Sequence, residues 1–195
     1  MDLIPAPQPP WAHLFPVRPP LAIPPQAGSV FLWGDARVYG VALHTAARVL
    51  AHGAQVAIID ADMVFQLRPL VAMAKACRVP PEVFLRRTHI VRAFTCWQFT
   101  TLFCERLDPL LATHPIGLVI LLDPLTHFFD EAVTRKEATP LFRRVLDTLA
   151  QRPAAGPRLL VAQTVPAYRP PGRRFARDLL RVVDVGLRLP PGEGR

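Results

Sequence analysis

Long hydrophobic runs are missing from this sequence, although 51% of its residues are hydrophobic. The longest uninterrupted apolar stretch lies around Leu118 to Leu122 and is far shorter than the roughly 20 residues that a membrane-spanning helix needs. The sequence starts Met1-Asp2-Leu3, without the basic and apolar segments of a secretory signal. These absences exclude a transmembrane helix and predict a cytoplasmic protein without membrane contact.

Cysteine is scarce, and the familiar catalytic patterns are absent. The three cysteines, Cys77, Cys96 and Cys104, form no CxxC pair, which argues against a zinc site and fits reduced thiols inside a cell. The sequence contains no HExxH motif and no GxSxG elbow, so we expect neither metalloprotease nor serine-hydrolase activity.

Lysine is rarer still, with two residues against 21 arginines. The formal net charge of +8 favours partners that carry phosphates or carboxylates. Arginine-rich composition also follows from GC-rich coding, so charge by itself does not establish a nucleic-acid partner.

Proline divides the chain into two parts. Residues 1–28 hold nine of the 23 prolines, with Trp11, Leu14 and Phe15 between them. Such spacing forbids a helix and favours an extended arm, which either docks on another subunit or packs along its own core. Residues 29–195 have enough apolar material for one core domain.

Short apolar runs alternate with helical patterns along the core domain. Strands are expected at 29–33, 55–60, 88–92, 118–123, 158–163 and 182–189, and helices at 41–52, 69–77, 97–113 and 138–151. This alternation predicts an α/β fold with a mostly parallel central sheet flanked by helices on both faces. Ligands of such sheets lie at the carboxyl ends of the strands.

The first strand runs into a helix through Gly34 to Gly40, the position of a phosphate-binding loop. A working loop, G-x-x-x-x-G-K-[ST], needs a lysine for the phosphates and a hydroxyl for magnesium. Counted from Gly34 those positions fall on Gly40 and Val41, and counted with Gly40 as the second glycine they fall on Val41 and Ala42. The alternative is that both glycines serve an ordinary turn, and Tyr39 and Arg37 are placed to fill it.

Carboxylates follow two of the predicted strands. Asp60 and Asp62 come at the end of the second strand, and Asp123 ends the apolar run 118–122. In a nucleotide hydrolase such acids hold magnesium and orient the attacking water. The alternative is that they cap helices or form turns.

These motifs, taken in order, resemble the ATPase core of the RecA superfamily, in particular the RadA-type recombinases and their paralogues. Gly34-Asp35-Ala36-Arg37 is similar to the start of their phosphate loop, and residues 59–65, IDADMVF, to their "IDTEGTF" stretch. Arg92-Ala93-Phe94 repeats their "RAF" segment, residues 118–123 resemble their Walker B strand, and Val161-Ala162-Gln163 resembles the strand that ends in a nucleotide-sensing glutamine.

The resemblance implies a RecA-like P-loop NTPase fold with a degenerate Walker A loop. It implies that Asp62 takes the catalytic acid position, that Asp123 is the magnesium-linked acid and that Gln163 is the sensor. The implied cofactor site, for ATP and Mg²⁺, consists of Gly34, Arg37, Gly40, Asp62, Asp123 and Gln163. Because the lysine and hydroxyl are missing, binding or scaffolding is expected in place of ordinary ATP hydrolysis.

A dense basic segment follows Gln163. In the recombinases the corresponding region is a mobile loop that contacts single-stranded DNA, and here arginines beside Tyr168 and Phe175 would bind phosphates and stack on bases. The predicted DNA-binding residues are Tyr168, Arg169, Arg173, Arg174 and Arg177. The alternative is a solvated surface loop that leads into an amphipathic helical turn.

The sequence therefore predicts an accessory or scaffold protein of DNA repair or recombination. Its expected partners are single-stranded DNA, a RecA-type recombinase or repair polymerase, and further copies of itself. Two alternatives stay open: an ATP-binding enzyme in which Arg37 replaces the lysine, and a regulatory interaction module that does not bind DNA.

Overall fold

The computed structural model describes residues 27–152, 156–164 and 170–189, with side chains from 174 onward in the last range. Most of the predicted arm, together with Tyr168 and Arg169, lies outside the described residues. Ala27 is buried in the core, and the carbonyl of Gly28 accepts the N–H of Leu159.

Six parallel strands form one sheet in the order β3-β2-β4-β5-β1-β6. The strands are β1 (Ser29–Gly34), β2 (Gln55–Asp60), β3 (Thr88–Arg92), β4 (Ile116–Leu122), β5 (Arg158–Thr164) and β6 (Val185–Arg188). The two edge strands are short and partly exposed, whereas β2, β4 and β5 are buried along almost their whole length. This is the pattern of a parallel sheet that is covered on both faces, as the sequence predicted.

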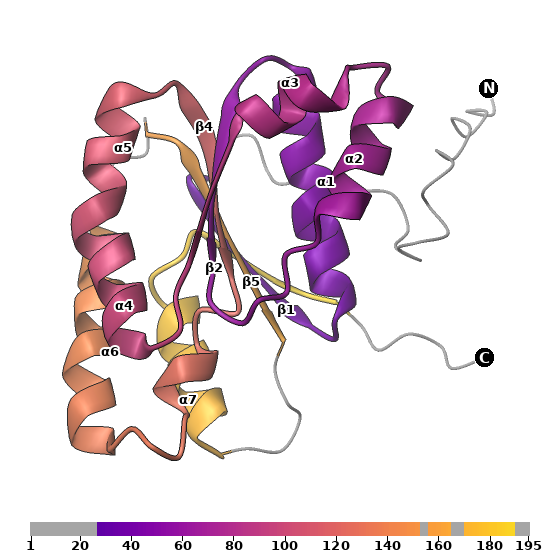
Figure 1. Cartoon of the computed structure of the whole chain (residues 1–195). Helices are drawn as coiled ribbons and strands as arrows, with labels where there is room; N and C mark the ends of the chain where they lie inside the picture. Colours follow the sequence, from indigo (N-terminus) through magenta and orange to yellow (C-terminus); the bar gives the residue numbers. More distant parts are fainter. Residues whose placement is uncertain (1–26, 153–155, 165–169, 190–195) are drawn as a thin grey trace, which may run out of the picture.

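Helices cover the two faces of the sheet (Figure 1). One face carries α1 (Arg37–Ala51), α2 (Leu67–Ala76) and α3 (Pro81–Arg86). The other carries α4 (Cys96–Thr101), the π-helical segment η1 (Leu102–Arg106), α5 (Leu107–Thr113), the 3-10 turn η2 (Thr126–Phe128), α6 (Arg135–Ala150) and α7 (Pro170–Leu180). The result is a three-layer α/β/α domain.

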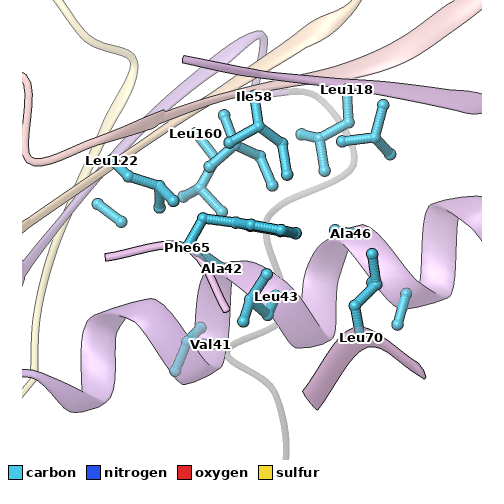
Figure 2. Packing of buried hydrophobic residues seen from close by; sticks show 14 of the residues in the cluster. Val41, Ala42, Leu43, Ala46, Ile58, Phe65, Leu70, Leu118, Leu122 and Leu160 are labelled. Atoms are coloured by element: carbon cyan, nitrogen blue, oxygen red, sulfur yellow. The ribbon is translucent and has the colours of Figure 1, made fainter. Parts of the chain in front are cut away.

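Each face of the sheet has its own hydrophobic core. Figure 2 shows the first, in which Ala42 and Ala46 of α1 face Ile58, Leu118 and Leu160 of the sheet. Because the alanine side chains are small, the helix can lie close to the strands. The large apolar side chains of the sheet then fill the space between helix and sheet.

Most predicted elements were confirmed, with shifted boundaries. Helix α1 begins at Arg37 and not at Val41, because only Asp35 and Ala36 separate it from β1. The helix expected at 97–113 is interrupted by η1. Pro109, in the α5 segment that follows, has no N–H to donate to the carbonyl of Glu105 in η1. The short helix α3 was not predicted.

The basic segment after β5 differs most from its prediction. Residues Pro170–Leu180 form helix α7, in which Ala176 and Leu179 are buried against the sheet. The closing strand expected at 182–189 shortens to Val185–Arg188, since the N–H of Val182 still bonds to the carbonyl of Leu179. From Pro170 onward, the alternative of an amphipathic helix is therefore the correct one, and the mobile loop implied by the resemblance is not.

Candidate functional site

Three of the predicted site residues, Gly34, Asp62 and Asp123, lie along one edge of the sheet. Asp123 follows β4, and its backbone N–H bonds to Ala162 of the neighbouring β5. Gly34, the last residue of β1, pairs in register with Thr164 at the end of β5. Asp62 follows β2, next to β4, and its charge acts on Asp123. The shared edge that the sequence predicted is confirmed.

The carboxylate of Asp123 is enclosed by hydrogen bonds. Its Oδ1 accepts the backbone N–H of Thr164 at 2.7 Å, and the Thr164 hydroxyl lies 2.9 Å from Oδ2. The Tyr39 hydroxyl donates to Oδ2 and lies 3.1 Å from the hydroxyl of Thr164. With 1% of the residue exposed, both carboxylate oxygens are occupied by the protein itself.

Burial sets the protonation behaviour of this cluster. It raises the pKa of Asp123, because the charged form loses water, and the hydrogen bonds from Tyr39 and Thr164 offset part of that rise. The nearby charge of Asp62 raises it further. Burial, followed by the bond to Asp123, also raises the pKa of Tyr39 well above its ordinary value, so its phenol stays neutral.

The backbone of Asp123 has the left-handed conformation, with φ +47°. Aspartate tolerates this conformation better than most residues because its short polar side chain can bond locally. The turn that results lets the N–H of Leu125 donate to the Gln163 side chain at 2.9 Å. Gln163 in turn donates to the carbonyl of Thr164 at 2.8 Å, so both ends of its amide are used within the chain.

The turn after β1 is too short to surround a phosphate chain. Asp35 accepts the N–H of Arg37 at 3.0 Å, which places a carboxylate where a helix N-terminus would otherwise attract an anion. The Arg37 guanidinium pairs with both oxygens of the same carboxylate at 2.8–3.0 Å. This pairing raises the pKa of Arg37 and neutralises the charge that was expected to replace the missing lysine.

The glycine at the end of β1 serves packing. A Cβ added to Gly34 would lie 2.9 Å from the Cβ of Leu189 and 3.0 Å from its carbonyl oxygen. Leu189 is held there by its N–H, which bonds to Trp33 at 2.8 Å. The close approach that Gly34 permits is thus to the chain after β6. The second glycine, Gly40, is buried within helix α1.

Asp60, two residues before Asp62, has a structural role. It is fully buried, and its carboxylate accepts the N–H groups of Val64 and Phe65 at 3.0 and 3.1 Å, with Arg92 Nε 3.6 Å away. These bonds fold the loop after β2 so that Phe65 enters the core beneath it (Figure 2). For Asp60, the alternative of turn formation is the correct one.

These contacts do not fit a magnesium–triphosphate pair. The acid that would bind the metal has both oxygens bonded, the sensor amide is occupied, and the turn offers neither lysine nor hydroxyl. Within the described ranges, no group of three or more His, Cys, Asp or Glu residues could hold a metal ion. Sequence reasoning missed Thr164, whose only signal is its position directly after Gln163 at a strand end.

The predicted DNA-binding residues that the structure describes lie on the same helix as Phe175, but the ring of Phe175 is engaged by other aromatic side chains. Arg174 and Arg177 lie exposed on α7, and Arg173 belongs to the same helix but its side chain is not described. Phe175 packs against Phe142, 4.4 Å between ring centroids, and against Phe129 at 5.1 Å. A ring in this position cannot stack on a base.

Comparison with known proteins adds no family: no protein-family model matches the chain, and no curated protein matches it. In the part of the chain that the structure describes, no helix has the length and apolarity to cross a bilayer. The class defined by fold and site is an α/β protein with a six-stranded parallel sheet and an acidic cluster, closed by a tyrosine, at the carboxyl ends of its strands.

Proposed function

We propose that this chain is a RecA-like accessory or scaffold protein of DNA repair or recombination that does not turn over ATP. The observation that carries the proposal is the closure of Asp123 by Tyr39 and Thr164. A residue that must bind metal-linked water and release product needs an accessible carboxylate, whereas this one is bonded on both oxygens and buried.

The order of residues along the sheet edge supports the RecA-like part of the proposal. The resemblance implies a phosphate-loop turn, a catalytic acid, a Walker B acid and a sensor, and Gly34, Asp62, Asp123 and Gln163 meet at one edge. The closing contacts come from Asp35, Tyr39 and Thr164, which convert the same positions into packing and hydrogen bonding.

An ATP-binding enzyme is the rival, and calorimetric titration with ATP and Mg²⁺ decides between them. We expect no saturable binding at micromolar concentrations by the wild-type protein. Micromolar binding that disappears in Asp123→Ala would contradict the proposal and favour the enzyme. Circular dichroism of the variant is the control, because loss of binding counts only if the variant is folded.

Contact with single-stranded DNA is the second part of the proposal, and the exposed arginines of α7 support it. Arg174 and Arg177 add positive charge to a chain of net charge +8. We expect binding of a labelled oligothymidine strand to weaken as salt rises, and to weaken further in Arg177→Ala. Absence of binding at low salt would remove DNA as a partner and leave the regulatory interaction module.

Association with a recombinase, a repair polymerase or a second copy needs a protein-binding surface, and edge strand β3 supplies one. Ile90 and Val91 are 42% and 39% exposed on it, and Phe94 and Trp97, which follow, are 56% and 44% exposed. An open strand edge beside exposed apolar side chains is a template for pairing with another chain.

A further inference from the structure

A groove of about 730 Å³ lies between helices α6 and α7, beside the turn η2. Its floor is apolar, with Phe142 and Phe128 buried and Phe129, Phe175 and Leu146 half-buried. It lies on the α6–α7 face of the domain, and none of the residues that line it belongs to the Asp123 cluster.

Arginines surround this floor. The groove is lined by Arg135 and Arg143 of α6, by Arg174 of α7 and by Arg181, which follows α7, together with Asp130 and Asp178. Arg181 is 3.4 Å from Asp178, so that pair is neutralised. Among the described residues, no ion pair involves Arg135, Arg143 or Arg174. Their exposed guanidinium groups give the groove an excess of positive charge.

The rings of the floor pack against one another in a way that suits an aliphatic or aromatic side chain better than a base. Phe128 and Phe142 meet at 68° with centroids 5.4 Å apart, and Phe142 and Phe175 meet at 76°. In each of these edge-to-face pairs, the edge of one ring lies against the face of the other. Base stacking needs an open, flat ring face, whereas an inserted side chain needs only apolar surface.

We propose that the groove binds an acidic segment of a partner protein, with an apolar side chain on the phenylalanine floor and carboxylates on Arg143, Arg174 and Arg135. Charge selects this occupant. The segments of this chain outside the described residues carry only two acids, Asp2 and Glu193, and a second copy has the same net charge of +8. The segments of this chain have too few carboxylates for these arginines, and a second copy would be repelled because of its own positive charge.

The residues that line the groove lie apart from the Asp123 cluster and the edge strand β3, and only Arg174 is shared with the arginines proposed to contact DNA. Helix α7 also provides an internal control. Arg177 is exposed on the same helix and equally charged, but it does not line the groove. A change at Arg177 alters the charge of the helix without altering the groove.

Fluorescence anisotropy of the full chain with a labelled synthetic peptide tests the proposal. The probe alternates Asp or Glu with Leu or Phe over about twelve residues, a length that spans such a groove. Saturable binding is expected at low salt, with affinity falling by about tenfold in Arg143→Glu and in Arg174→Glu and less than about twofold in Arg177→Glu. Phe129→Ala should also weaken binding.

Four results would overturn the proposal. One is absence of saturable binding at low salt. The second is an equal loss of peptide affinity in Arg177→Glu and Arg174→Glu. The third is equally tight binding of a peptide in which Ser replaces every Leu and Phe. Either of these two results would mean that binding depends only on the overall charge of the protein. The fourth is binding of oligothymidine, or of a peptide with residues 8–18 of this chain, by the groove in place of the acidic peptide. Arg143→Gln and Arg174→Gln provide the test if the reversals do not fold.

Discussion

At the scale of single residues, three side chains decide what the strand ends can do. Tyr39 and Thr164 bond to the carboxylate of Asp123, while Asp35 bonds to the first N–H of α1. Each of these side chains occupies a polar group that a nucleotide or its metal ion would otherwise contact. The acid, the turn and the sheet edge were all visible in the sequence, but the partner of each polar group was not.

The titration of Asp123 leads to a prediction about stability. Its pKa is raised in the folded protein, so the folded state binds the proton more tightly than the unfolded state does. The free energy of unfolding should therefore fall as pH rises from about 3.8, the ordinary value, through the raised pKa. The Asp123→Asn variant has no titrating group at this position, so its free energy of unfolding should not fall in this way as pH rises.

Urea denaturation of both proteins across the acidic range checks this expectation. The stability difference between wild type and Asp123→Asn should change with pH in that window and level off above it. A difference independent of pH, or one that changes in the opposite direction, would contradict the raised pKa. Glu137, whose pKa is lowered by bonds from Thr134, is present in both proteins and cancels.

At the scale of elements, the β1–α1 turn and helix α7 lie at their predicted positions in the chain, but their contacts differ from those expected of a phosphate loop and a DNA-binding loop. The strand, the turn and the following helix occupy the places predicted for a phosphate loop, yet the turn has only two residues and is covered by the chain after β6. Likewise the basic segment is a helix whose apolar side, through Ala176 and Leu179, covers the sheet.

Gly34→Ala tests whether the glycine serves packing. The new Cβ would meet Leu189 at 2.9 Å, so either the chain after β6 shifts or stability is lost, at a cost of about 1–3 kcal/mol. Thermal and urea unfolding measure that cost. Ala132→Ser, at an exposed turn position outside the helices and strands, is the control and should leave stability unchanged. Unaltered stability in Gly34→Ala would contradict the packing role.

At the scale of the whole molecule, three surfaces are open to partners: the exposed arginines of α7, the groove between α6 and α7, which shares Arg174 with them, and the apolar edge at β3. Because both oxygens of Asp123 are bonded within the protein, the proposed function places partner binding on these surfaces. The β3 edge shares no residue with the other two surfaces, so a partner bound there would leave α6 and α7 free for a second one.

Self-association should depend on the β3 edge. Val91→Lys places a charge on the open strand, which opposes edge-to-edge pairing. If copies associate there as proposed, sedimentation of the wild-type protein should show oligomers whose proportion rises with concentration, and the variant should show fewer. Leu85→Lys, on α3 with similar exposure of 39%, is the control. A wild-type protein that stays monomeric at high concentration would contradict this use of the edge.

The sequence by itself determined the α/β alternation, the parallel sheet and the set of residues at the strand ends, because apolar periodicity and strand-end carboxylates are local patterns. Only the tertiary structure decided that Tyr39 reaches Asp123 from another element, that Leu189 crosses Gly34, and that Phe175 lies among the rings of α6 and η2. Those contacts join residues far apart along the chain, and packing, which no local pattern encodes, brings them together.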